Sequence, residues 1–575
     1  MVLPIFRRLL SMCCGLFCMA GSLAQIANRF DVVIDELLPD PSPPVQLPAI
    51  EFIELKNVST TAFNIRNWKL SDGSTTATIT TSFLLQPDSF VIICPNTAVT
   101  AFAPFGKAIG VSNFPSLNNE GDVISLYRAE GNLIHAVSYN SSWYQNAVKS
   151  DGGWSLEMID TKNPCAGMSN WKASTNNNGG SPGKKNAVDD TNKDEQPPAL
   201  YRSATTDSLT ISALFDEPLD SVTAAIPGNY TINNGIAHPA YASVMMPLCT
   251  EVVLKLAAPL NNQTVYELKV NNVKDCAGNS INQLNTAKAG LPVMADSLAI
   301  VINEILFNPR PDGFDYIELY NRSNRTIDLK QLYLATRNAT GQLTGITPIS
   351  TASWLFFPGE YRALTENSLW LQQQYLIKDP SLIVTMPALP SMPDDKGIIV
   401  LMNAQGNIID ELHYDHTWHF GLISDEEGIA LERHNYNEPT QQPSNWSSAA
   451  STAGFGTPGY LNSQFMADAG PQGQVSVTPA VFSPDNDGFN DFATIDLQLP
   501  EPGYVANIRI FDANGHIVRR LVQNATLSAT GRFRWDGLDD NLNKLPVGIY
   551  VVLTELFNGQ GKTKKFKQAV TLARR

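Results

Sequence analysis

The chain has 575 residues, of which 43% are hydrophobic and 17% are charged, and its formal net charge is −15. This length predicts about three to five domains, and the balance of apolar and charged residues excludes a largely disordered chain. The negative charge argues against nucleic acid as a partner, because phosphate binding needs a basic surface. Generous glycine (38) and proline (37) favour many short strands joined by turns.

Residues 1–24 have the pattern of a signal peptide. Arg7 and Arg8 precede the apolar stretch "LLSMCCGLFCMAG", and "SLAQ" supplies small residues for cleavage after Ala24. A lipidated cysteine within this stretch is the less favoured alternative, since the residues before its cysteines suit that reaction poorly. No later segment is long and apolar enough to predict a membrane span. We therefore expect an exported chain, placed outside the cell or on the outer-membrane surface.

Four cysteines follow the signal peptide, and an even number in an exported chain predicts disulfides. They are Cys94, Cys165, Cys249 and Cys276. We expect Cys94 to pair with Cys165 and Cys249 with Cys276, because each pair falls within one predicted domain. A zinc site with four cysteine ligands is the weaker alternative, because no two of these cysteines have the C-x2-C spacing.

The chain repeats itself. Matching segments are "VIDELLPDP" (33–41) and "INEILFNP" (302–309), "EFIELKN" (51–57) and "DYIELYN" (315–321), and "SNWKASTNNNGGSPGKKN" (169–186) and "SNWSSAASTAGFGTPGYLN" (444–462). Similarity on this scale indicates two homologous domains rather than a solenoid of short repeats. Within each copy, apolar runs alternate around Gly-containing turns, which predicts an all-β fold of antiparallel β-sandwiches.

These matching segments resemble the lamin tail domain, in the form found in secreted bacterial proteins. The resemblance covers residues 27–187 and 297–465, and it implies tandem immunoglobulin-like sandwiches. Between them, residues 197–296 contain the markers "F-x-E-P-L" and "V-x-D-x-x-GN" and resemble the bacterial Ig-like modules of surface proteins. Such modules usually act as spacers.

The last part of the chain, residues 475–575, contains "FSPDNDGFNDFATIDLQL" and "VANIRIFDANGHIVRRL". It resembles the Ig-like domain of the flagellar hook-capping protein, and the C-terminal domains of type IX secretion cargo and of gliding-motility-associated proteins. The resemblance implies the type IX secretion machinery as a partner, with a role in export or surface attachment.

The stretch "SPDNDGFND" offers oxygen ligands on a Gly-containing turn, which suits a hard cation such as Ca²⁺. The candidate ligands are Ser483, Asp485, Asp487 and Asp491. Thr494 stands where a calcium loop usually has its bidentate glutamate, so the alternative is a turn whose side chains cap their own backbone. Any calcium here would be structural.

A second candidate metal site is the cluster "HYDHTWH". Its residues are His413, Asp415, His416 and His419. His413 and Asp415 share one face of a predicted strand, so a transition metal is geometrically feasible. The first copy has Ser138, Asn140, Ser141 and Tyr144 at the matching positions, so such a metal cannot be essential to the fold.

Two glutamates recur in both copies. They are Glu36 and Glu54 in the first and Glu304 and Glu318 in the second. Carboxylates at matched places indicate a requirement of the shared fold, such as a cross-strand partner or an acceptor for loop amides. A cation or ligand contact and acid/base catalysis are the alternatives.

No nucleophile elbow, metalloprotease motif, P-loop or Rossmann fingerprint occurs in the sequence, and no long stretch is left for a catalytic domain. We therefore expect a non-catalytic surface protein whose lamin-tail-like domains act as binding or adhesion modules for a glycan or a protein. The aromatic side chains of Trp143, Tyr144, Trp418 and His419 could stack on such a ligand, with core packing as the alternative for the two tryptophans. The rival function is a secreted metal-dependent nuclease or phosphoesterase, or its accessory binding protein, because lamin-tail-like domains often accompany such enzymes.

Overall fold

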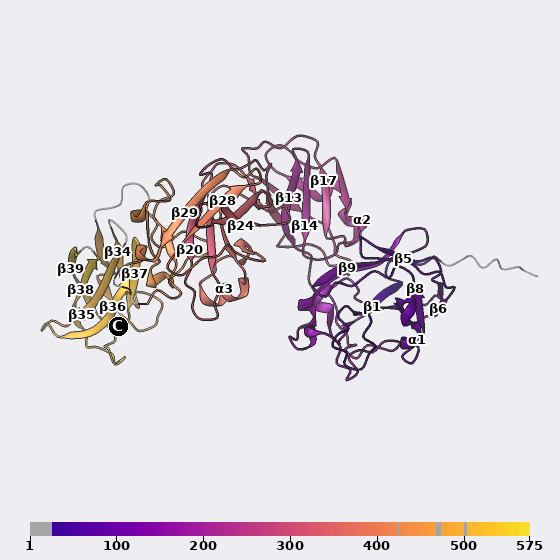
Figure 1. Cartoon of the computed structure of the whole chain (residues 1–575). Helices are drawn as coiled ribbons and strands as arrows, with labels where there is room; N and C mark the ends of the chain where they lie inside the picture. Colours follow the sequence, from indigo (N-terminus) through magenta and orange to yellow (C-terminus); the bar gives the residue numbers. More distant parts are fainter. Residues whose placement is uncertain are drawn as a thin grey trace, which may run out of the picture.

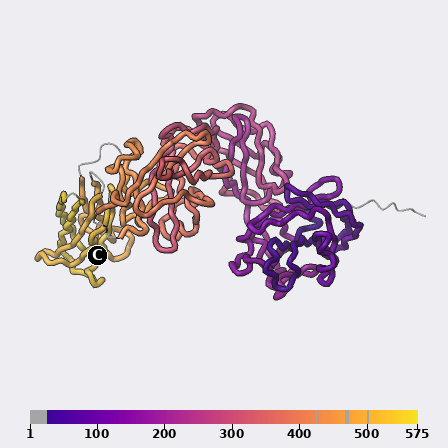
Figure 2. The backbone as a smooth tube through the Cα atoms, viewed as in Figure 1, coloured from indigo at the N-terminus to yellow at the C-terminus, as the bar shows by residue number. Residues whose placement is uncertain are grey.

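The computed structural model describes residues 26–421, 423, 425–466, 473–499, 503–559 and 561–574. The predicted signal peptide and most of the predicted linker at 465–474 lie outside these residues. The predicted all-β fold of tandem antiparallel sandwiches is confirmed, and four units follow one another in an arched row (Figure 1). The smooth trace in Figure 2 shows the first and last units at opposite ends of the row. In the described part of the chain, every helix is too short or too polar to span a membrane.

The first unit, which we call the first repeat, packs a six-stranded sheet against a four-stranded sheet. The larger sheet has the order β12 (Trp171–Ala173), β11 (Leu156–Met158), β1 (Val32–Leu38), β2 (Phe52–Asn57), β7 (Phe90–Pro95) and β8 (Ala108–Val111). The smaller has the order β10 (Leu133–Asn140), β9 (Gly121–Tyr127), β4 (Lys69–Ser71) and β5 (Thr76–Thr78). A short pair, β3 (Phe63–Asn64) and β6 (Leu84–Leu85), and helix α1 (Val99–Phe102) complete it.

The third unit, the second repeat, has the same arrangement. Its larger sheet has the order β27 (Ile383–Thr385), β26 (Tyr361–Thr365), β21 (Tyr316–Asn321), β20 (Ile300–Leu306), β30 (Leu431–Arg433) and β31 (Trp446–Ser448). Its smaller sheet has the order β24 (Leu343–Pro348), β23 (Leu332–Arg337), β28 (Lys396–Asn403) and β29 (Ile408–Asp415). The pair β22 (Ile327–Asp328) and β25 (Leu355–Phe356) and helix α3 (Ser368–Gln374) match β3, β6 and α1.

In both repeats the central strands are buried along their whole length, because β1 and β20 have apolar cores on one face and a chain segment on the other. That segment follows the last strand and crosses the outer face of the large sheet. We call it the closing loop, residues 175–188 in the first repeat and 451–464 in the second. It contains the "SPG" and "TPG" motifs noted in the sequence.

The second unit is a smaller sandwich between the repeats. One sheet has the order β13 (Leu200–Asp207), β14 (Thr210–Phe215), β17 (Glu251–Lys255) and β16 (Tyr241–Val244). The other has the order β15 (Tyr230–Ile232), β18 (Tyr266–Val270) and β19 (Thr286–Ala289), and helix α2 (Ser221–Ala224) connects β14 to β15.

The fourth unit is again a two-sheet sandwich. Its three-stranded sheet has the order β32 (Gln474–Thr478), β34 (Ala493–Gln498) and β37 (Thr530–Trp535). Its five-stranded sheet has the order β33 (Val481–Phe482), β39 (Thr563–Leu572), β38 (Gly548–Asn558), β35 (Tyr504–Phe511) and β36 (Ile517–Thr526).

The disulfide in the structure differs from the predicted pairing. Cys165 of the first repeat bonds to Cys276 of the second unit, while Cys94 and Cys249 are free, buried thiols. The prediction that each disulfide would close within one domain was therefore wrong. The physical reason is that Cys94 lies inside β7 and packs in an apolar cluster, whereas Cys165 and Cys276 lie on loops that meet at the junction. Their bond ties the first repeat covalently to its neighbour.

Candidate functional site

The matched glutamates lie at the centre of the large sheet of each repeat. Glu36 of β1 is opposite Glu54 of β2 and Glu157 of β11. The second repeat has the same cross-strand arrangement, formed by Glu304, Glu318 and Glu432. All six side chains are fully buried. Like charges directly opposite one another on adjacent strands are destabilising, so these triads need hydrogen-bond donors or protons.

In the first repeat, the closing loop supplies these donors. The backbone N–H of Ser181 donates to Glu36 Oε1 at 2.8 Å, and that of Val188 donates to Glu157 Oε2 at 3.1 Å. The N–H of Gly183 donates to Glu54 Oε2. Thus all three carboxyl groups accept hydrogen bonds from one loop, which they fix to the sheet.

The second repeat uses equivalent contacts. The backbone N–H of Thr457 donates to Glu304 Oε1 at 2.8 Å, and that of Gln464 donates to Glu432 Oε2 at 2.7 Å. The N–H of Gly459 donates to Glu318 Oε2. The closing loops of the two repeats are therefore held by matching carboxyl groups in the same way.

Burial dominates the titration of Glu36, Glu54, Glu304 and Glu318. It raises the pKa of Glu36, Glu54 and Glu304 well above the usual range, and neighbouring carboxylates raise each further. Burial also raises the pKa of Glu318 to about 8, although hydrogen bonds from Gly459 and Asn303 lower it in part. A protonated carboxyl stands beside a neighbouring carboxylate without like-charge repulsion.

The sequence pattern located Glu36, Glu54, Glu304 and Glu318 but missed Glu157 and Glu432. These two follow Leu156 and Leu431 at matched places in the repeat, and that shared "LE" was the signal available. The outer face of the sheet is covered by the closing loop rather than by water. Each carboxyl accepts a loop amide, which is one of the roles that the repeat predicted for them.

Beside the triads, the two repeats differ in a way that the sequence did not predict. In the second repeat, Tyr320 stacks on Tyr436 with ring centroids 4.0 Å apart, and Tyr436 stacks on Phe465 at 4.7 Å. Tyr361 completes this aromatic stack, with its hydroxyl 2.7 Å from that of Tyr436. Four aromatic rings thus fill the space beside β21.

In the first repeat the same positions hold Lys56, Phe90, Thr161 and Asp189, as strand registers and closing-loop contacts show. Here the surface is hollowed into an open pocket of about 1220 Å³, which also reaches Cys276 and Ala277 of the second unit. Its charged lining residues are Lys56, Asp88, Asp160, Lys162, Lys185, Asp189, Asp190, Lys193, Asp194 and Glu195. We call this hollow the junction pocket.

The predicted histidine cluster does not converge on one point. His413 Nε2 lies 2.7 Å from Glu411 Oε1, and His416 Nδ1 lies 3.4 Å from Glu426 Oε2. His419 is buried, its Nδ1 is 2.9 Å from Ser448 Oγ, and burial lowers its pKa to about 4. Asp415 accepts the N–H of Thr417 and caps a short turn. These side chains therefore point to separate partners.

The candidate calcium loop does bring its carboxylates together. Asp485, Asp487 and Asp491 place one oxygen each within 4.8 Å of one another on an exposed turn. Asp491 also accepts the N–H groups of Asn486 and Gly488, and Ser483 Oγ donates to Asp485 at 3.0 Å. The geometry therefore accommodates both alternatives, a cation site and a turn capped by its own side chains.

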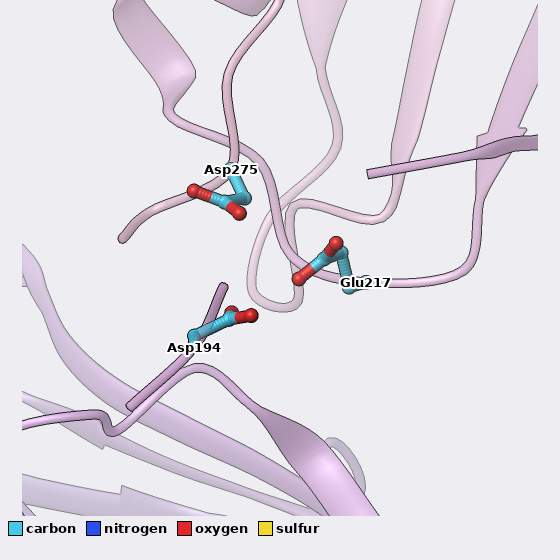
Figure 3. A group of neighbouring side chains, drawn as sticks. All are labelled: Asp194, Glu217 and Asp275. Atoms are coloured by element: carbon cyan, nitrogen blue, oxygen red, sulfur yellow. The ribbon is translucent and has the colours of Figure 1, made fainter. Parts of the chain in front are cut away.

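The sequence pattern did not single out a third acidic group. Asp194, Glu217 and Asp275 point toward one another beside the Cys165–Cys276 bond (Figure 3), with oxygens within 4.8 Å. Burial and the two aspartates raise the pKa of Glu217 to about 8. Glu217 and Asp275 lie within the Ig-like markers "F-x-E-P-L" and "V-x-D-x-x-GN", so the signal was present there. Oxygen ligands alone would suit a hard cation.

The aromatic residues considered for ligand stacking belong to the cores. Trp143 and Tyr144 are buried, and Trp143 packs on Trp171 with centroids 6.1 Å apart. Trp418 packs in the same way on Trp446, at 6.5 Å. These side chains therefore pack in the cores, which was the alternative to ligand stacking.

Comparison with known protein families agrees with the architecture. The Lamin Tail Domain family matches residues 25–141 and 294–416, which lie in the first and second repeats. The CHU_C type IX secretion signal domain family matches residues 476–572, the fourth unit. No curated protein matches the chain.

Solved structures give only distant similarity. The FlgD structure from P. aeruginosa is 21% identical and covers 18% of this chain and 78% of its own, with a TM-score of 0.13. PorZ of Porphyromonas gingivalis, a surface component of the type IX secretion system, is 10% identical over 90% of this chain and 76% of its own, with a TM-score of 0.15. The S-layer protein SbsC is 11% identical over 66% and 54%, with a TM-score of 0.16.

The family matches, together with the duplicated sandwiches, identify the parts of the chain. The two repeats are lamin tail domains, and the fourth unit is a type IX secretion signal domain. The type IX secretion signal domain points to export and to the cell surface. The chain is therefore an exported cell-surface protein with two lamin tail domains and a C-terminal type IX secretion signal domain.

Proposed function

We propose that this surface protein is a non-catalytic binding protein and that its first lamin tail domain carries the binding site. The observation that supports the proposal is the junction pocket of about 1220 Å³. The second domain has an aromatic stack at the equivalent place. Because the two domains share one frame, the pocket is a local departure from it, and function in duplicated domains commonly lies in such departures.

The pocket lining indicates the class of ligand. Lysine ammonium groups and aspartate carboxylates stand close together there, and Phe90 forms an apolar part of the wall. Hydrogen-bonding groups of both signs beside an aromatic ring suit a hydroxyl-rich ligand such as a surface glycan. Lys56 lies over the Phe90 ring at 5.1 Å, so the ligand would meet the ring edge and the ammonium together.

The absence of catalysis is also part of the proposal. The buried carboxyl triads accept loop amides and are shielded from solvent. A general acid or base must reach the proton that it transfers, and these groups are covered by the closing loops. The histidines point to separate partners.

We further propose that residues 1–24 are a signal peptide, that the fourth unit binds the type IX secretion machinery, and that the turn at 483–491 binds calcium as a structural ion. A role in gliding motility is part of the same proposal. Removal of residues 475–575 tests the secretion step. The truncated chain should accumulate in the periplasm, and surface delivery without this unit would contradict the assignment.

The binding function is tested with the full mature chain, labelled and applied to a glycan array and to whole bacterial cells. We expect saturable binding to a glycan class, and no hydrolysis of DNA or phosphoesters with magnesium, manganese, zinc or calcium. Binding to neither array nor cells would mean that the lamin tail domains are spacers. Turnover that disappears in Glu304→Gln or His416→Ala would mean that the protein is an enzyme.

A further inference from the structure

One position in the buried sheet differs between the two lamin tail domains in a chemically decisive way. In the second domain, Asn303 of β20 donates its amide hydrogens to Glu318 Oε1 at 2.7 Å and to Asn462 Oδ1 at 2.6 Å. In the first domain the equivalent residue is Asp35, which follows from the matching strand registers. A deprotonated aspartate has no hydrogen to donate.

The partners of this residue are the same in both domains. Asn186 donates to the backbone oxygens of Asp35 and Met158, as Asn462 does to those of Asn303 and Arg433. Asn186 is therefore anchored in the same orientation, with its Oδ1 directed at the side chain of residue 35. Glu54 likewise occupies the cross-strand position in the first domain that Glu318 occupies in the second.

The consequence is a group of acceptors without a donor. Within the described part of the chain, four buried oxygens at this place have no hydrogen-bond partner: Asp35 Oδ1, Glu36 Oε2, Glu54 Oε1 and Asn186 Oδ1. In the second domain, the matching oxygens of Glu304, Glu318 and Asn462 all accept hydrogen bonds. Buried acceptors are rarely left unpaired, so the first domain needs a proton or a cation at this position.

A proton fits better than a cation. Among the described residues, the groups of three acidic side chains with oxygens within 4.8 Å are Asp194/Glu217/Asp275 and Asp485/Asp487/Asp491. The carboxyls around Asp35 are spread along the sheet and do not form such a group. One proton on Asp35 would instead supply one hydrogen-bond donor at the position where Asn303 supplies two in the second domain.

Charged and titratable groups face Asp35 from every neighbouring element. They are Glu36 on its own strand, Glu54 and Lys56 on β2, Glu157 on β11, Asp88 before β7 and Asp189 directly after the closing loop. Burial raises the pKa of Asp35 to about 7, and Lys56 opposes this shift while the carboxylates add to it.

We propose that Asp35 makes the closing loop of the first lamin tail domain a pH-sensitive latch, which is closed when Asp35 is protonated and loosens as pH rises through neutrality. The loop carries Lys185 into the wall of the junction pocket and leads directly into Asp189 of the same wall, so loosening also affects that wall. In the second domain, the amide of Asn303 carries no titrating proton at the position of Asp35. The latch does not depend on the proposed binding function.

The direction of the pH effect follows from the thermodynamic linkage between protonation of Asp35 and folding. The folded-state pKa of Asp35 lies above its unfolded value of 3.8, so the native domain holds this proton more tightly. The stability from this group is fully present below pH 3.8 and is lost as pH rises towards 7. Between pH 6 and pH 8, a folded pKa near 7 implies that the local opening constant rises about tenfold.

Hydrogen exchange of the full mature chain, followed by mass spectrometry between pH 6 and pH 8, tests the latch. The reporters are the amides of Ser181, Gly183 and Val188, with Thr457, Gly459 and Gln464 as their counterparts. After correction for intrinsic exchange, we expect protection of the first set to fall by about tenfold more than that of the second.

Two matched variants make the test specific. Asp35→Asn should abolish the excess loss of protection in the first domain, and Asn303→Asp should create it in the second. An unchanged pH dependence in both variants would overturn the proposal. So would calcium or magnesium restoring protection at pH 8 in the parent but not in Asp35→Asn, because the site would then hold a cation. If Asp35→Asn fails to fold, Asn303→Asp alone decides.

Discussion

The two lamin tail domains share a frame and differ beside it. Both have a carboxyl triad beneath a closing loop. In both, the tryptophan that begins the last strand of the large sheet packs on a second tryptophan. The first domain has Asp35, an open junction pocket and a covalent link to its neighbour. The second has Asn303 and a stack of aromatic rings. The difference indicates that the frame is maintained by folding, whereas the surface beside it has diverged.

The two domains also differ in how they are joined to neighbouring units. The first is tied to the second unit by the Cys165–Cys276 bond. The second contacts the fourth unit through hydrogen bonds, such as those from Gln464 to Leu527 and from Ser451 to Thr526. The bond thus fixes the junction at which the pocket lies.

The largest expected effect tests what the domains share. Trp171→Ala and Trp446→Ala should each lower the free energy of unfolding of their own domain by about 3–5 kcal/mol, because each removes a nearly fully buried indole. Thermal unfolding combined with domain-resolved hydrogen exchange measures both. A loss of unfolding free energy below about 1 kcal/mol in one domain alone would show that the two domains do not share the same core packing.

The next effect tests the asymmetry of the junctions. Cys165→Ser should lower the stability of the first domain and second unit by about 2–4 kcal/mol, since the bond closes a long loop. Calorimetry of the oxidised chain and the variant measures this change. Cys249→Ser is the control, because Cys249 is buried but unbonded. Equal losses in the two variants would contradict the covalent junction.

A smaller effect tests the aromatic stack. Tyr436→Thr gives the second domain the residue that the first domain has at this position, Thr161. The exchange should lower the free energy of unfolding by about 2 kcal/mol, because a mostly buried ring is removed. Urea unfolding of the variant measures the loss. An unchanged stability would mean that the stack does not contribute to the fold.

The smallest expected effect is that of calcium on the proposed calcium turn, and the closing loops of the two repeats serve as internal controls. At a calcium concentration of twice Kd, binding at 483–491 should stabilise the fourth unit by about 0.6 kcal/mol. Hydrogen exchange with and without calcium should show protection at this turn and no change in either closing loop. Asp487→Asn should remove the effect, and protection of a closing loop instead would contradict the placement of the ion.

Much of the fold could be predicted from the sequence. Alternating apolar residues and turn signals predicted the sandwiches, and the internal repeat placed Glu36, Glu54, Glu304 and Glu318 at equivalent sites. The pairing of Cys165 with Cys276 could not be predicted, because it depends on how two domains meet. Local patterns carry no information about such a junction.

The junction pocket could not be predicted from the sequence pattern either. It arises because Lys56, Thr161 and Asp189 stand where the second domain has the rings of Tyr320, Tyr436 and Phe465, and Lys56 is far from the other two in the chain. Likewise, Asp35 and Asn303 look like a conservative exchange until their partners are known. Only the contacts of Asn303 reveal that a donor is missing in the first domain.

The most direct measurement of the central claim is binding of the labelled full chain to whole bacterial cells, with the pocket filled by residues of the second domain. Thr161→Tyr with Asp189→Phe should abolish saturable binding while leaving the unfolding transition in place. The reciprocal control, Tyr436→Thr with Phe465→Asp, should leave binding unchanged. Undiminished binding by the filled variant would contradict the assignment of the junction pocket as the binding site.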